Sequence, residues 1–225
     1  MEKTVKKRVS EEWLRAFSQL SAFSQNKFYK ILGSCLIGIE LIKSPLKENY
    51  SPYFVIYPLW KKDVKSNLNY PIILKEFKDK NGYQYDIPYE MSSVILSDVI
   101  KRVRQNCPLP FDSNIPLLSI LSLMDTFSKE PPLSAAPNSY LQAVLQESKL
   151  KIALYGSIQK SQIIFNQIKK TNWDAHHFSA CGVDLNNWLE SLREELDNRE
   201  DFLRQIEINK RDSKILKLKF SEIII

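Results

Sequence analysis

Glycine is scarce in this chain, with five copies among 225 residues. The phosphate-binding loops of the Walker and Rossmann kinds depend on several closely spaced glycines, which let the backbone approach a phosphate group. No stretch of the sequence offers such a cluster. Nucleotide binding of either kind is therefore excluded.

Cysteines and long apolar runs are scarce as well. Cys35, Cys107 and Cys181 lie far apart and form no Cys-x-x-Cys pair, so they indicate neither a disulfide framework nor a cysteine zinc site. No stretch approaches the roughly 20 apolar residues of a membrane-spanning helix, and the basic segment 3–8 is not followed by the apolar core of an export signal. We expect a protein of the reducing cytoplasm that does not enter a membrane.

The rest of the composition is that of a folded globular protein. Hydrophobic residues make up 44% of the chain and charged residues 26%, which allows a sizeable core. We expect one continuous body in three parts. These are residues 1–128, with a helix, a sheet and two further helices; a linker-like loop over 129–139, rich in proline, serine and alanine; and a helical region over 140–225.

The first 90 residues predict a helix followed by an antiparallel meander of about four strands. Ser10 is a candidate N-cap for a helix that runs to about Gln25, with Trp13, Phe17 and Leu20 on one face. Apolar, β-branched and aromatic stretches follow. They predict one strand over 31–43, a second over 52–60, and a hairpin over 70–89.

The hairpin has two possible registers. A two-residue Asn-Gly loop would place Phe77 opposite Asp86, whereas a type I turn with Gly82 in a left-handed bulge places Phe77 opposite Tyr85. We prefer the second register, because it gathers Phe77, Tyr83 and Tyr85 on one face.

Beyond Tyr89 the pattern turns helical. The first helix has Met91, Ile95, Val99 and Val103 at helical spacing, and the next, which starts at Pro116, is apolar nearly all round and is expected to be buried. The final segment 214–225 fits either a strand at the sheet edge or a helical turn. The candidate N-caps are Ser92 or Ser93, Asn138 or Ser139, Ser157 and Asp184, with an interruption at Asp197 and Asn198.

One short stretch between two predicted helices contains both histidines of the chain. His177 and Cys181 have the i, i+4 spacing that could face one zinc ion, and His176 is adjacent. A zinc site needs further ligands, and only Asp174 and Asp184 are near in the sequence. We favour a connector in which Asp184 caps the following helix, and we expect no metal here.

A second constellation lies in the predicted meander. Asp63 follows one strand, and Glu76 and Lys78 form a Glu-x-Lys pattern on the next. This arrangement resembles the catalytic pattern of the PD-(D/E)xK nucleases, and the resemblance implies that the carboxylates of Asp63 and Glu76 hold Mg²⁺ and that water is activated at a phosphodiester. The chain departs from the pattern, because no proline precedes Asp63 and Lys75 interrupts the apolar run. The alternative is a solvated strand face, which requires no cofactor.

Aromatic and basic side chains are concentrated around the same meander. The net charge is +6, with basic clusters at 3–8, 61–65 and 101–104. Exposed Tyr and Trp residues interleaved with Lys could anchor a protein interface or stack on nucleic-acid bases. The candidate partner-binding residues are Tyr53, Tyr57, Trp60, Lys61, Lys62, Tyr83 and Tyr85.

These observations favour a non-catalytic protein whose partner is another protein. The profile, a single body without catalytic motifs, resembles that of bacterial immunity proteins, which neutralise a toxin by occluding it; an adaptor is the related possibility. Two alternatives stay open. One is a Mg²⁺-dependent nuclease that uses Asp63, Glu76 and Lys78, and the other is a basic module that binds nucleic acid without catalysis.

Overall fold

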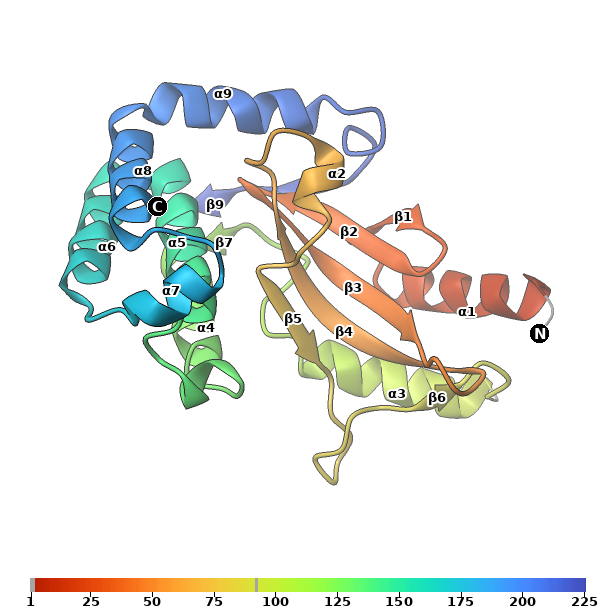
Figure 1. Ribbon diagram of the computed structural model, residues 1–225. Coiled ribbons are helices and arrows are strands. Elements are labelled where there is room, and N and C mark those ends of the chain that lie inside the picture. The colour runs from red at the N-terminus through yellow and green to blue at the C-terminus, as the bar shows by residue number, and fades with distance from the viewer. Residues whose placement is uncertain (1–2, 92) are drawn as a thin grey trace.

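An antiparallel meander of five strands forms most of the N-terminal half of the computed structural model, which describes residues 3–91 and 93–225 (Figure 1). The strands follow one another in space in chain order, and two short strands join the same sheet, one beside β4 and one parallel to β2. The strands are β1 (Ser21–Ser24), β2 (Lys27–Leu32), β3 (Cys35–Lys43), β4 (Asn49–Pro58), β5 (Ile73–Glu76), β6 (Ile87–Pro88) and β8 (Phe220–Ser221).

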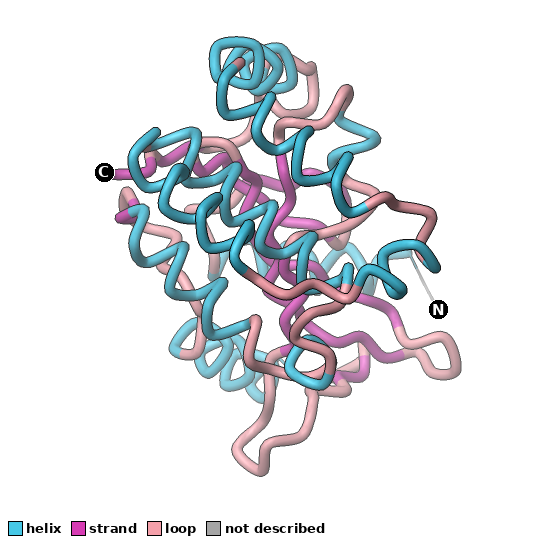
Figure 2. Tube along the Cα trace, turned by 60° about the vertical axis from the view of Figure 1, so that its left-hand side comes forward, coloured by secondary structure: helices cyan, strands magenta, loops and turns pink. Residues whose placement is uncertain are grey.

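Helices make up most of the C-terminal half, and several of them pack side by side (Figure 2). A second, two-stranded sheet pairs β7 (Ile115–Pro116) with β9 (Ile223–Ile224). The predicted α+β class is therefore confirmed. The helices are α1 (Lys3–Ala16), α2 (Val64–Asn67), α3 (Ser93–Gln105), α4 (Leu117–Phe127), α5 (Tyr140–Gly156), α6 (Ile158–Lys170), α7 (Ala175–Ala180), α8 (Leu185–Asp197) and α9 (Arg199–Lys210), with a 3-10 turn at Leu133–Ala135.

The main sheet lies between two apolar layers. On one face, Phe28 and Phe54 pack in the same cluster as Trp13 of α1. On the other, Tyr29 and Val55 pack in a second cluster, which also contains side chains of α9. Side chains alternate between the faces of a strand, so β2 and β4 contribute to both layers.

The first helix differs from its prediction at both ends. Ser10 lies inside α1, where its hydroxyl donates to the carbonyl of Lys6 at 2.9 Å, so it is not the N-cap. The helix extends back through the basic segment, whose lysines and arginine are good helix formers, and it ends at Ala16 rather than at Gln25. Trp13 and Phe17 are buried together, as their spacing predicted.

The apolar run from Ile31 forms two strands rather than the single strand predicted. β2 ends at Leu32, β3 begins at Cys35, and Gly33 has a φ of 54° in the turn between them. Because glycine takes the left-handed region without a steric penalty, this residue lets the chain reverse inside an apolar run. Ile31 and Leu36 then pair across the hairpin.

The register preferred for the later hairpin is confirmed. Tyr85 N–H donates to the carbonyl of Phe77 at 3.3 Å, and Gly82 has the left-handed φ of 84°. The expected aromatic face does not form, because Phe77 is buried whereas Tyr83 is 73% exposed. Beyond β5, Lys78 and Gln84 form an isolated antiparallel bridge between the two arms of this hairpin.

The predicted N-cap residues correctly indicated where several later helices begin. The side chains of Ser139, Ser157 and Asp184 cap α5, α6 and α8 as predicted, and the break before α9 falls at Asn198. Ser92 lies outside the described residues, and α3 begins at Ser93.

The buried face of α3 does not follow the apolar spacing seen in the sequence, and the expectation that α4 is buried was wrong in part. In α3 the buried face contains Leu96, whereas Ile95 is exposed, and in α4 Leu118 is exposed although the helix was expected to be buried all round. In both helices, only some of the apolar side chains pack against the core, and the others are exposed. The final segment 214–225 contributes two short strands, β8 and β9, and no helix is assigned there.

One buried cluster joins both halves of the chain. It contains Phe54 of the sheet, Met124 of α4 and Leu150 of α5, together with Leu133 from the segment predicted as a linker. The three-part division stays a prediction. Within residues 3–91 and 93–225, no helix has the length and apolar character required to cross a membrane.

Candidate functional site

Strand β5 forms one end of the main sheet. Its inner edge pairs with β4, with Leu74 opposite Val55 and Glu76 opposite Tyr53. In the part of the chain that the structure describes, no backbone hydrogen bond joins Leu74, Lys75 or Glu76 to any segment other than β4. The outer edge of β5 therefore has backbone donors and acceptors without a strand partner.

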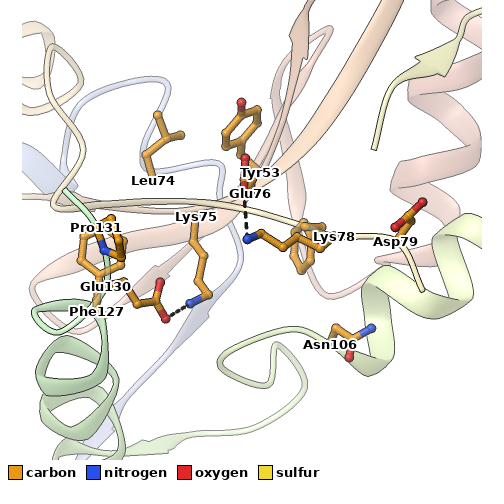
Figure 3. A pocket seen from close by; sticks show the side chains of 11 residues that line it. Tyr53, Leu74, Lys75, Glu76, Lys78, Asp79, Asn106, Phe127, Glu130 and Pro131 are labelled. Carbon is orange, nitrogen blue, oxygen red and sulfur yellow. Dashed lines mark hydrogen bonds and ion pairs between the residues drawn. The ribbon is translucent and has the colours of Figure 1, made fainter. Parts of the chain in front are cut away.

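A groove of about 790 Å³ follows this edge (Figure 3). Its lining includes every residue from Leu74 to Asp79, and Tyr53 on the neighbouring strand. Because successive side chains of a strand point to opposite faces, a groove that touches six consecutive residues follows the edge, and Tyr53 shows that it also reaches over one face onto β4. The opposite wall consists of Asn106 at the end of α3, Phe127 at the end of α4, Glu130 and Pro131.

The groove contains charges of both signs. Lys75 reaches across to Glu130 and forms an ion pair with it, and the Nζ atom of Lys78 lies 3.4 Å from the Oε1 atom of Glu76 (Figure 3). Asp79 adds a third carboxylate at one end. Two lysines thus face three carboxylates, and the groove has no excess of positive charge.

The groove continues into an apolar pocket of about 200 Å³ beside α5. Leu74 and Phe127 line both cavities. Leu74 is 41% exposed, and Leu141 and Val144 on α5 are 54% and 38% exposed. The remaining lining consists of Pro71, Ile72, Pro132, Leu133, Leu145 and Ser148. The groove therefore has a charged end and an apolar end.

The charged end is shaped by the hairpin that follows β5. The side chain of Asp79 accepts hydrogen bonds from the N–H groups of Asn81 at 2.8 Å and Tyr83 at 3.0 Å, which closes the turn around Gly82. These bonds are local and hold the hairpin in the shape that ends the groove.

The structure brings two of the three nuclease candidates to this groove but not the third. Asp63 is the N-cap of α2, where its carboxylate accepts the N–H of Ser66 at 2.7 Å, and this hydrogen bond lowers the pKa of Asp63. Glu76 pairs with Tyr53, whereas Asp63 follows the far end of β4 at Pro58. The strand from Tyr53 to Pro58 alone spans roughly 16 Å. Asp63 and Glu76 therefore do not form the carboxylate pair that would share one Mg²⁺.

Of the seven predicted partner-binding residues, Tyr53 alone lines the groove. Tyr57 is buried, and its hydroxyl donates to the carboxylate of Glu40 at 2.9 Å. Burial and, after it, the charge of Glu40 raise the pKa of Tyr57. Tyr29 and Lys27 donate to the same carboxylate, so Tyr57 belongs to a buried hydrogen-bond network and cannot contact a partner.

Two of the other predicted contact residues pack against neighbouring side chains. Trp60 packs against Phe202 with ring centroids 6.1 Å apart, under α9. The Nζ atom of Lys61 lies 5.9 Å from the ring centroid of Tyr70. Lys62 and Tyr83 are exposed, and Tyr85 is half-buried. The basic clusters lie on different elements, 3–8 on α1, 61–65 at α2 and 101–104 on α3.

The histidine stretch forms the connection between α6 and α8. Asp174 caps the short helix α7, and the Nδ1 atom of His177 lies 3.3 Å from the backbone N of Tyr140 and 3.9 Å from the Sγ atom of Cys181. His176 is exposed. The described residues contain no group of three or more His, Cys, Asp or Glu that could hold a metal ion.

Sequence reasoning missed the outer wall of the groove. Phe127, Glu130, Leu141 and Val144 lie 50 or more residues after β5. The only signal near them was the proline content of 129–139, which was interpreted as a linker. Comparison of the chain with protein-family models, curated proteins and solved structures finds no match. Its function is therefore inferred from the geometry of this chain.

Proposed function

We propose that this protein is a non-catalytic protein-binding protein whose partner docks on the groove along β5. The observation that carries the proposal is the coincidence of an unpaired sheet edge with a groove along it. An unpaired edge is a template for another chain. The apolar end, with Leu74, Leu141 and Val144 exposed side by side around one pocket, supplies surface whose burial would stabilise a complex.

The charges of the groove support a protein partner over a nucleic acid. A phosphate backbone is bound by an excess of lysine and arginine, whereas here three carboxylates face two lysines. The separation of Asp63 from Glu76 likewise gives the nuclease alternative no support. An inhibitor that occludes its partner and an adaptor would both use such a surface.

We propose a reducing compartment, such as the cytoplasm, for this activity. Cys35, Cys107 and Cys181 are all free thiols, and burial raises the pKa of Cys35 and of Cys107 to about 12. Binding of a partner along the groove does not require oxidation of these cysteines.

The proposal is tested by affinity capture from the extract of the native host. The tagged full-length protein is compared with the double variant Leu74→Glu/Leu141→Glu and with Leu46→Glu, a matched control at a residue that is 92% exposed outside the groove. A partner retained by the wild type and by Leu46→Glu, but reduced at least about tenfold by the double variant, is expected, because a buried carboxylate without a partner is costly. Equal recovery with all three folded proteins would exclude the groove as the binding surface.

A further inference from the structure

We infer that the partner supplies an extended segment that pairs with the free edge of β5 as an additional strand, with an apolar residue two positions from a basic residue. This inference rests on the proposed function and specifies the chemistry of the partner. It predicts how the segment is oriented and which of its atoms are required.

The backbone of β5 favours an extended segment over a helix. The groove follows the strand edge, where outward N–H and C=O groups lie at alternate residues. Four residues of β5 span roughly 13 Å, so a segment of about five residues would satisfy these groups. A helix has its own backbone groups bonded internally and cannot do this.

The apolar residue is positioned by the alternation of side chains. Ile72, directly before β5, lies two residues from Leu74, so their side chains point the same way, and both line the pocket with Leu141 and Val144. A side chain opposite Leu74 on an added strand would lie on this face, since directly opposite residues are close neighbours. An aliphatic or aromatic side chain at this position would fill the pocket.

The basic residue follows from the next position on the same face. Two residues along β5, Glu76 lies beside Tyr53. The carboxylate of Glu76 has only Lys78 as an ion-pair partner in the described residues, at 3.4 Å and with both side chains exposed, an arrangement worth little. A lysine or arginine of the partner opposite Glu76 would meet this carboxylate. The predicted pattern is therefore apolar, any residue, basic, in one chain direction or the other.

A second copy of this chain fits the edge poorly. Antiparallel self-pairing of β5 centred on Lys75 would place Lys75 near Lys75 and Leu74 near Glu76, which combines like charges with an apolar residue against a carboxylate. A lysine on an edge strand is a common protection against such self-association. A different polypeptide is the better occupant.

The first test uses a phage-displayed library of random linear 12-residue peptides, panned against the immobilised full-length protein. Peptides with the predicted pattern are expected, and their affinity should fall at least about tenfold with Leu74→Glu and be unchanged with Leu46→Glu. Glu76→Lys should switch the selected residue from basic to acidic. Enrichment of no peptide, or of peptides indifferent to both groove substitutions, would overturn the inference.

The second test is specific for strand pairing. In a selected peptide, each backbone amide is methylated in turn. Pairing along one edge uses alternate N–H groups, so every second methylation should weaken binding about tenfold and the intervening ones should have little effect. Sensitivity without this alternation would overturn strand addition. If affinity capture still depends on the groove in that case, the proposed function stands and the inference alone fails.

Discussion

Replacement of Gly38 by alanine should destabilise the protein far more than a single methyl group usually does. Gly38 lies in β3 opposite Tyr29 of β2. A Cβ atom on Gly38 would lie 1.9 Å from the carbonyl oxygen of Phe28 and 2.9 Å from the Cδ1 atom of Tyr29. The first contact is with backbone, so the two central strands would have to separate by roughly 1 Å in a close-packed interior.

The cost can be worked out from these contacts. Overpacking of this kind costs about 1 to 3 kcal/mol. Displacement of Tyr29 would also weaken the hydrogen bond from its hydroxyl to the carboxylate of Glu40, which is worth about 1.5 to 3 kcal/mol because the acceptor is charged. Alanine in place of glycine also lowers the conformational entropy of the unfolded chain, which offsets at most about 1 kcal/mol of this loss of stability. We expect a net loss of about 3 kcal/mol in the free energy of unfolding.

Urea unfolding followed by circular dichroism measures this loss. With an m-value of about 2 kcal/mol/M, the midpoint of Gly38→Ala should fall by about 1.5 M. Gly82→Ala is the control, since its φ of 84° is strained for alanine but its Cβ atom would meet nothing within 4 Å; we expect it to cost about 1 to 2 kcal/mol. A free energy of unfolding of Gly38→Ala within about 0.5 kcal/mol of the wild type, or a smaller loss than that of Gly82→Ala, would refute a steric clash at Gly38.

Two further predictions concern titratable groups. A thiol-specific reagent such as DTNB should modify the exposed Cys181 fastest, the half-buried Cys107 more slowly and the buried Cys35 only on unfolding, because burial raises the pKa of Cys35 and of Cys107 to about 12; three equally fast thiols would contradict this. Burial also raises the pKa of Tyr29 and Tyr57, so the folded state favours their neutral form and its stability should decrease as the pH rises above about 10, the value in the unfolded chain. Phenolate absorbance should then report these two tyrosines only together with the loss of structure, and ionisation of all tyrosines in a folded protein would be inconsistent with their burial.

Features determined by neighbouring residues could be predicted from the sequence. Asp184 caps α8 because its carboxylate accepts the N–H of Asn187, three residues away, and the turn at Gly82 is likewise closed within the hairpin. The apolar run from Ile31 was misinterpreted because a turn at Gly33 and a continuous strand have the same hydrophobic pattern.

The groove depended on contacts that no local pattern specifies. Glu76 was identified as a candidate from its Glu-x-Lys pattern, but the wall opposite it is formed by residues such as Asn106 and Phe127. The proline-rich segment 129–139 was interpreted as a linker from composition alone. In the structure its Glu130 forms an ion pair with Lys75, and Leu133 is buried. Only the folded chain brings these residues to the edge of β5.

The most direct test of the central claim is hydrogen exchange of the backbone amides, measured on the full-length protein with and without the captured partner. Binding along β5 predicts slower exchange within Leu74–Asp79, and in the amides near Leu141, while those of β1 at the opposite edge of the sheet keep their rates. Unchanged exchange over Leu74–Asp79 with protection elsewhere would contradict the account.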